Sequence, residues 1–186
     1  SIFRLIFVGR LIKTKGVHLL LRSLKSIARE WDLLIIGNGP EEKFLKDYIM
    51  NDDFLKKRVR FKDFMENSQI FDCLKRSDVL VLPSIKKDGW GVVVNEALMV
   101  GTQVIVSDKC GSSILIQDFT KGEVVKAGSL KSLSDAIKTR INEGKLNVEE
   151  REKIKRWSEL SITGDIAAEY MLKCIEGKTI KSPWSK

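Results

Sequence analysis

The sequence predicts an α/β fold: a doubly wound, Rossmann-like parallel sheet of about six strands, with helices on both faces and a helical C-terminal appendage. Short apolar runs rich in β-branched residues alternate with segments whose apolar residues recur at helical spacing. This alternation is typical of a parallel sheet between two layers of helices. Several runs end directly before glycine or proline, where a strand is expected to stop. The predicted strands cover residues 3–8, 33–36, 59–61, 78–82, 104–106 and 124–125.

Helical spacing begins after residue 15, where five apolar residues form one stripe and the basic residues lie on the opposite, solvated face. Pro40 is expected to open a second helix, whose inner face comprises Phe44, Leu45 and Tyr48. Further helices are predicted over residues 69–75, 92–100, 130–141, 148–157 and 166–175.

The length predicts one domain with an extension. A chain of 186 residues and 21.1 kDa suffices for one ordinary domain. On folding, a chain of this size buries roughly 70% of the surface that it exposes when unfolded, so it can form a sizeable core without disulfides or metal ions. We expect residues 1–142 to form the Rossmann-like part and residues 143–186 to form a helical appendage of the same domain.

The composition excludes several classes of protein and of site. Hydrophobic residues make up 43% and charged residues 31% of the chain, as in soluble globular proteins, and no apolar run approaches the ~20 residues that span a bilayer. The three cysteines are widely spaced, which indicates a reducing cytoplasm rather than a disulfide framework or a zinc cluster. The single histidine, His18, argues against a Ser-His-Asp triad and against a histidine-rich metal site.

Positive charge is concentrated near the N-terminus. The net charge is +8, and residues 1–29 carry seven basic side chains and no acidic one. Such asymmetry indicates an anionic partner, which on charge alone could be a phosphate, a nucleic acid or an acidic membrane surface.

The first candidate motif runs from Gly9 to Gly16, directly after the first predicted strand. The guanidinium group of Arg10 suits bidentate contact with phosphate, and the ammonium group of Lys15 would add a second cation at the start of the next helix. Parallel sheets bind ligands outside the carboxyl ends of their strands. We therefore expect Arg10 and Lys15 to hold a diphosphate.

The second candidate motif covers residues 84–96, after the fourth predicted strand. Gly89 and Gly91 allow a ligand to approach the backbone, and the helix that begins near Gly91 offers free N–H groups for phosphate. Asp88 and Glu96 flank this helix start and could accept hydrogen bonds from sugar and ribose hydroxyls. The alternatives are that Asp88 caps the helix and that Glu96 is a solvated helix residue.

Other glycine-rich segments give weaker signals. Residues 37–40 lack the third glycine of a dinucleotide fingerprint, and no Walker-type phosphate loop occurs. The segment 107–113 follows a strand and is either a further ligand loop or a plain turn. No Asp-x-Asp metal motif stands at a strand end, so no metal is expected.

Taken in order, five motifs resemble those of the group 1 glycosyltransferases, which are retaining enzymes of the two-domain GT-B fold. The resemblance covers roughly residues 3–175. It rests on Phe7-Val8-Gly9-Arg10-Leu11 with Lys15-Gly16, on Ile36-Gly37-Asn38-Gly39-Pro40-Glu41, on residues 77–84, on Gly89-Trp90-Gly91 and on Asn95-Glu96-Ala97.

The resemblance implies that the chain is the C-terminal, donor-binding half of such an enzyme, with residues 1–142 binding a nucleotide-sugar. Arg10 and Lys15 would contact the diphosphate, and with Asp88 they would form the catalytic set. The family's Glu-x7-Glu motif falls on Asp88 and Glu96, with aspartate replacing the first glutamate. The further donor-binding residues would be Gly9, Gly89, Trp90, Gly91 and, in the nucleobase pocket, Phe64.

The implied function is that of a hexosyltransferase that moves a sugar from a nucleoside diphosphate to a glycan or lipid-linked acceptor, in glycan or polysaccharide biosynthesis. No cofactor or metal ion is implied. The family's N-terminal acceptor domain has no counterpart in the sequence, so the half-enzyme is expected to be inactive alone. A cytoplasmic location is expected, and the basic helix face allows contact with the inner side of the membrane.

Three other functions stay open at this point. A non-catalytic nucleotide-binding regulatory module would keep Arg10 and Lys15 but would need no acid at Asp88. A sugar-nucleotide epimerase fragment of the same fold would need an acidic, histidine-rich centre that is not visible. A nucleic-acid-binding domain would use the basic N-terminal third, but aromatic residues are not interleaved there.

Overall fold

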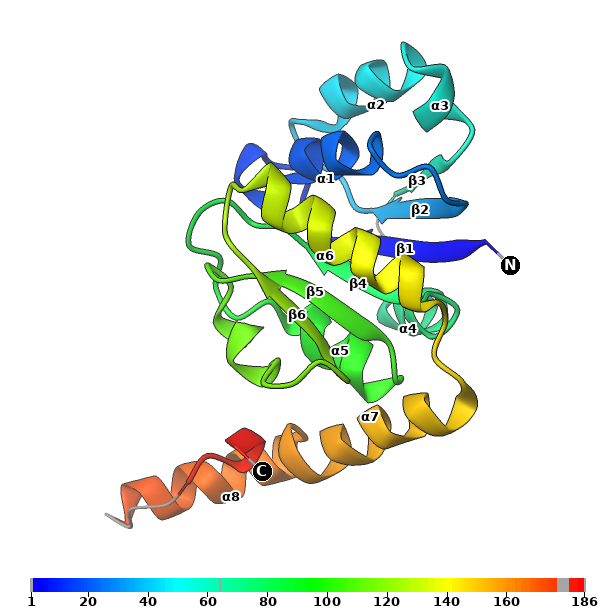
Figure 1. Cartoon of the computed structure of the whole chain (residues 1–186). Helices are drawn as coiled ribbons and strands as arrows, with labels where there is room; N and C mark the ends of the chain where they lie inside the picture. Colours follow the sequence, from blue (N-terminus) through cyan, green and yellow to red (C-terminus); the bar gives the residue numbers. More distant parts are fainter. Residues whose placement is uncertain (1, 64, 177–180, 186) are drawn as a thin grey trace.

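The computed structural model describes residues 2–63, 65–176 and 181–185. Its centre is one six-stranded sheet in the order β3-β2-β1-β4-β5-β6, and every pair of neighbouring strands is parallel (Figure 1). This confirms the predicted fold class. The strands are β1 (Phe3–Val8), β2 (Trp31–Ile36), β3 (Val59–Lys62), β4 (Val79–Leu82), β5 (Gln103–Ser107) and β6 (Gly122–Val125).

Helices cover both faces of this sheet. Helices α1 and α6 pack against each other on one face, and α4 and α5 lie on the other (Figure 1). The α-helices are α1 (Val17–Leu24), α2 (Glu42–Met50), α3 (Asp53–Lys56), α4 (Asn67–Lys75), α5 (Val92–Met99), α6 (Leu130–Glu143), α7 (Val148–Ser161) and α8 (Gly164–Ile175). Three short 3-10 helices, η1 (Lys13–Lys15), η2 (Gly111–Leu115) and η3 (Pro183–Ser185), complete the structure.

The strand order reverses between β1 and β4, which are adjacent in the sheet although two strands separate them in the chain. In a doubly wound sheet this reversal opens a crevice beyond the carboxyl ends of the strands, because the loops on either side turn to opposite faces. The two candidate motifs follow β1 and β4. The topology therefore places both of them at the crevice.

The core follows the predicted periodicities. All five residues of the predicted apolar stripe are buried: Val17, Leu20, Leu21 and Leu24 on α1, and Ile27 just beyond its end. In α2 the expected inner face is partly wrong, because Phe44 is 54% exposed while Leu45 and Ile49 are buried. The helix begins at Glu42 rather than at Pro40. Leu45 and Ile49 are four residues apart and share the buried face, whereas Phe44 lies about 100° from Leu45 around the helix and so points outward.

Two local elements differ from the prediction. Lys15 belongs to η1, not to the first turn of α1, because Gly16 adopts a left-handed conformation (φ 73°) between the two helices. The short helix α3 has no periodic signal in the sequence. It forms because the Asp52 side chain accepts hydrogen bonds from the amides of Phe54 and Leu55 and so caps the helix start.

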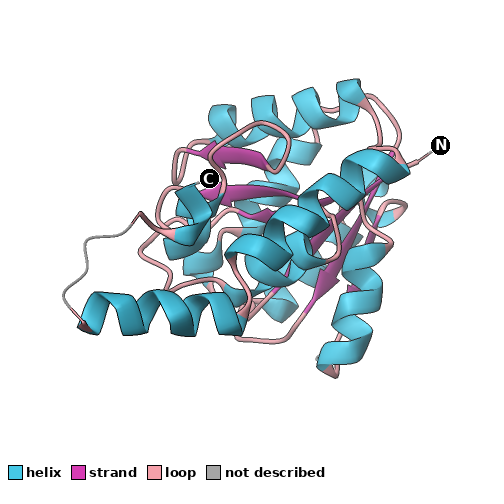
Figure 2. Cartoon of the chain, turned by 90° about the horizontal axis from the view of Figure 1, so that it is seen from below, coloured by secondary structure: helices cyan, strands magenta, loops and turns pink. Residues whose placement is uncertain are grey.

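The two C-terminal helices differ in how they pack. Helix α7 packs against α5, and Arg151 ties it to the sheet layer by donating to the carbonyls of Lys75 and Ser77 and to the hydroxyl of Thr102. Helix α8 has no buried residue and extends beyond the sheet (Figures 1 and 2). In the part of the chain that the structure describes, no helix is long and apolar enough to cross a bilayer.

Candidate nucleotide-sugar site

The loops after β1 and β4 are in direct contact. The amide of Ile85 donates to the carbonyl of Thr14 at 2.8 Å. A Cβ atom on Gly16 would lie 2.2 Å from the carbonyl oxygen of Pro83, so only glycine lets the two backbones approach this closely. The first candidate motif is thereby held against the second.

Lys15 and Asp88, 73 residues apart in the chain, form an ion pair at this contact. The Lys15 Nζ atom lies 2.8 Å from Oδ1 and 2.7 Å from Oδ2 of Asp88, and the Ser84 hydroxyl donates to the same Oδ2 at 2.6 Å. Both side chains of the pair are largely buried. One N–H of the ammonium group remains for a ligand, and one lone pair of Oδ1 remains for a hydroxyl.

Helix α5 begins beside this pair, and Gly91 is its N-cap, in a left-handed conformation with φ 78°. Asp88 lies three residues before Gly91 and does not cap the helix. The amides of Val92 and Val93 carry no hydrogen bond within the described residues. Free amides at a helix start, together with the positive end of the helix dipole, favour an anion such as phosphate.

Glu96 lies one turn further along α5 and is half-buried. Burial raises the pKa of its carboxyl group, because removal from water disfavours the charged form. Within the described residues the carboxylate has no hydrogen bond or ion pair. The carboxylate is therefore free to accept hydrogen bonds from ligand hydroxyls.

Arg10 and Trp90 complete the residues expected in contact with a donor. Arg10 follows Gly9 at the end of β1, is exposed, and forms no ion pair or hydrogen bond through its guanidinium group in the described chain. Trp90 is 42% exposed, and its indole N–H donates to Asn95 at 2.8 Å. Its ring also meets that of Trp184 at an edge, with centroids 6.5 Å apart. Phe64 lies outside the described residues.

The segment 107–113 belongs to the same edge, which the sequence alone left undecided. Asp88 and Cys110 form an isolated parallel bridge, in which the amide of Asp88 donates to the carbonyl of Lys109 at 2.9 Å. Gly89 continues this pairing by accepting from the amide of Gly111 at 2.9 Å. The sequence placed this segment after a strand, and the sheet order adds that this strand is the neighbour of β4.

Comparison with known proteins decides the family. The model of the glycosyl transferases group 1 matches residues 3–158. The chain belongs to this family. The match confirms the resemblance seen in the ordered motifs.

Curated relatives of this chain include proteins from several bacteria. Over 136 residues the chain is 29% identical to the phosphatidyl-myo-inositol mannosyltransferase of Mycobacterium leprae, and the match covers 71% of the chain and 35% of that protein. Over 153 residues it is 28% identical to an amylovoran biosynthesis glycosyltransferase of Erwinia amylovora, covering 78% of the chain and 37% of that protein. The chain thus spans about a third of the length of the relatives it matches.

Solved structures show the same fold. The Anabaena protein HepE in complex with UDP superimposes with a TM-score of 0.78 at 18% identity, over 95% of the chain and 49% of HepE. The pneumococcal O-GlcNAc transferase GtfA in complex with UDP and GlcNAc gives a TM-score of 0.74 at 24% identity, over 94% of the chain and 35% of GtfA. These matches support the assignment to the Rossmann-like part of the GT-B architecture.

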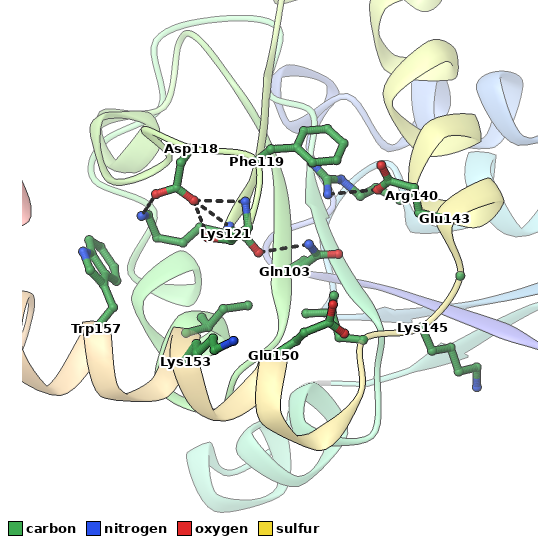
Figure 3. A pocket seen from close by; sticks show the side chains of 14 residues that line it. Gln103, Asp118, Phe119, Lys121, Arg140, Glu143, Lys145, Glu150, Lys153 and Trp157 are labelled. Carbon is green, nitrogen blue, oxygen red and sulfur yellow. Dashed lines mark hydrogen bonds and ion pairs between the residues drawn. The ribbon is translucent and has the colours of Figure 1, made fainter.

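The chain also has a hollow of about 560 Å³ at the opposite, amino edge of the sheet (Figure 3). It lies beside the starts of β5 and β6, the end of α6 and the face of α7. Its two buried cations already have partners: Arg140 pairs with Glu143 and donates to the carbonyl of Gly122, and Lys121 pairs with Asp118. Both buried cations of this hollow are thus engaged by the protein itself.

Metal-binding residues are sparse. Across residues 2–63, 65–176 and 181–185, no group of three or more histidine, cysteine, aspartate or glutamate side chains could hold a metal ion. His18 lies on α1, and burial lowers the pKa of its imidazole group. The candidate site therefore consists of cations, free amides and two carboxylates.

Proposed function

We propose that this chain is the donor-binding half of a retaining hexosyltransferase, which binds a nucleoside-diphosphate sugar at the carboxyl edge of the sheet. One observation carries the proposal: the Lys15–Asp88 pair stands beside the start of α5 at the topological switch between β1 and β4. The free groups of Arg10 and Glu96 lie on the loop and the helix that flank this pair. The UDP named with HepE and GtfA supports a nucleoside diphosphate as the ligand.

In the proposed complex the diphosphate accepts hydrogen bonds from the free amides of α5 and from Lys15, and Arg10 contacts it from the other side. These positive groups are fixed before the reaction and stabilise the charge that grows on the leaving diphosphate, an effect of several kcal/mol in comparable sites. Glu96 accepts from the ribose hydroxyls, and Asp88 accepts from a sugar hydroxyl with its remaining lone pair. No metal ion is needed for this charge stabilisation.

The proposal includes a second, acceptor-binding domain. Helix α8 exposes Met171, Leu172 and Ile175 at 62%, 61% and 77%, and such an apolar face on an extended helix suits contact with another domain. The chain also spans only about a third of its curated relatives. We propose that the acceptor is a glycan or a lipid-linked glycan at the cytoplasmic side of a membrane, and that this half alone transfers no sugar.

The proposal is tested by titrating the chain with UDP, GDP, ADP and dTDP in a calorimeter. At least one nucleoside diphosphate should bind, and Arg10→Ala and Lys15→Ala should each weaken it by about tenfold, because a hydrogen bond to a charged group is worth about 1.5–3 kcal/mol. Arg22→Ala is the matched control, since Arg22 is an exposed arginine on α1. Equal affinities in all four proteins would reject the diphosphate site.

A further inference from the structure

The loops after β4 and β5 enclose a hollow of about 740 Å³ beside Asp88. It is lined by residues 85–89 and 108–111, the two segments that pair through the bridge between Asp88 and Cys110. Its volume lies within the range of small-molecule sites. Neither Arg10, Lys15 nor the start of α5 lines it, so this hollow lies apart from the groups assigned to the diphosphate.

Both acids of the hollow are already engaged by the protein. Asp88 accepts from Lys15 and Ser84, as described above. Asp108 accepts from the backbone amide of Ala127 at 3.0 Å. Each negative charge of the hollow is therefore partly satisfied before any ligand arrives.

The three lysines of the hollow are in the opposite situation. Lys86, Lys87 and Lys109 line it, and all three are exposed. Within the described residues none of them forms an ion pair, although lysines elsewhere in the chain pair frequently, for example Lys46 with Glu42 and Lys131 with Asp135. The hollow thus presents three lysines without an ion pair on two adjoining loops, and lysines outnumber acids among its lining residues.

From this charge balance we propose that the sugar of the donor carries a carboxylate, so that the donor is a nucleoside-diphosphate uronic acid. This inference rests on the proposed function, which places the sugar next to Asp88. A neutral hexose brings no charge to this hollow, whereas a uronate adds one negative charge beside its three lysines. Because the lysines lie in water, each contributes modestly, and their combined effect provides selectivity rather than the main binding energy.

The test compares two donors that differ only at C6. UDP-glucuronic acid has a carboxylate where UDP-glucose has a hydroxymethyl group, and GDP-mannuronic acid and GDP-mannose serve equally if guanine is preferred. The uronate should bind about fivefold more tightly or better at low salt, and rising salt should reduce this preference because the lysines are exposed.

Two double variants test whether the preference for the uronate donor depends on the lysines of the hollow. The double variant Lys87→Met/Lys109→Met should bring the two affinities together and leave UDP binding unchanged, and Lys87→Glu/Lys109→Glu should favour the neutral sugar. Lys57→Met is the control, because Lys57 is an exposed lysine that the structure shows without an ion pair, at the far end of the sheet.

The outcomes separate the two proposals. Tight UDP binding that depends on Arg10, without any preference for the uronate, would overturn the uronate inference and leave the proposed function standing. Equal loss of UDP and UDP-glucuronic acid in the methionine variant would make the lysines phosphate ligands and would also overturn it. Failure of every nucleoside diphosphate to bind would reject the proposed function itself.

Discussion

The two edges of the sheet handle charge in opposite ways. At the amino edge, Arg140 is 2% exposed, stacks on the Phe119 ring and binds Glu143 and the Gly122 carbonyl. At the carboxyl edge, Arg10 is exposed and its guanidinium group has no partner in the described structure. The same side chain thus serves packing at one edge and stays available at the other.

The acidic residues of the two edges show the same contrast between paired and unpaired charges, with one exception. Asp118 at the amino edge is bound to Lys121. Burial is the largest single effect on its carboxyl group and would raise the pKa, but the hydrogen bonds from Lys121 and Thr120 and the charge of Lys121 together lower it. Glu96 at the carboxyl edge has no such bonds, and its pKa is raised. Glu123, whose Oε2 atom is buried without a hydrogen bond, is the exception at the amino edge. Charges that stabilise the fold are paired within it, and charges left unpaired beside a crevice are the ones a ligand can use.

The largest predicted effect comes from replacing Arg140, and the comparison is with the same replacement at Arg10. Arg140→Ala should lower the free energy of unfolding by about 3 kcal/mol, because it removes a buried side chain that packs on Phe119 and leaves the Gly122 carbonyl and the half-buried Glu123 without their cation. It should not change nucleotide affinity in the fraction that stays folded. Arg10→Ala should change stability by less than about 0.5 kcal/mol, since its head group is solvated, and should weaken the nucleotide. Urea unfolding and calorimetry on both variants measure the two quantities.

Arg140→Met serves as the control for lost volume and should recover part of the stability, because the aliphatic stem is retained. A variant at Arg140 that folds normally yet loses nucleotide binding would contradict the separation of the two edges.

A second prediction concerns the two glycines beside α5. A Cβ atom on Gly91 would lie 2.5 Å from the Cys110 sulfur, and its φ of 78° is unfavourable for alanine, so Gly91→Ala should cost about 1–3 kcal/mol of stability. Gly89 is the matched control, since a Cβ atom there would meet nothing within 4 Å. Thermal unfolding of both variants is the measurement, and equal melting temperatures would show that the start of α5 adapts to the side chain.

The smallest effects are expected for the two half-buried acids, Glu96 and Glu123. Burial raises both pKa values, so each charged form disfavours the folded state. Glu96→Gln and Glu123→Gln should therefore each raise stability, by less than about 1 kcal/mol because both carboxyls keep contact with water. Only Glu96→Gln should weaken a ribose-containing ligand.

The raised pKa of Glu96 also predicts how nucleotide affinity depends on pH. As pH falls from about 7 toward the ordinary glutamate pKa of about 4.3, Glu96 should gain a proton earlier than an ordinary glutamate, which favours the ligand-free fold and removes an acceptor for ribose. Nucleotide affinity should fall over this range in the unmodified chain and less in Glu96→Gln. Calorimetry at both pH values tests this, and an identical pH dependence in the variant would remove Glu96 from the site.

The hydrophobic periodicity of the sequence and its glycine and proline positions determined the fold class, all six strands, the apolar stripe of α1 and the start of α5 at Gly91. Each of these depends on residues close together in the chain. The motif order also indicated the family. Helix α3 escaped prediction because one capping aspartate, rather than a periodic pattern, creates it.

Only the tertiary structure decided which charges meet. The Lys15–Asp88 pair, the bridge that brings residues 107–113 beside Asp88, and the burial of Arg140 all join segments that are remote in sequence or belong to different elements. Sequence spacing carries no information about such contacts, since they depend on strand order and on the close approach of two backbones at Gly16. For the same reason the choice between a structural and a ligand-binding charge became visible only in three dimensions.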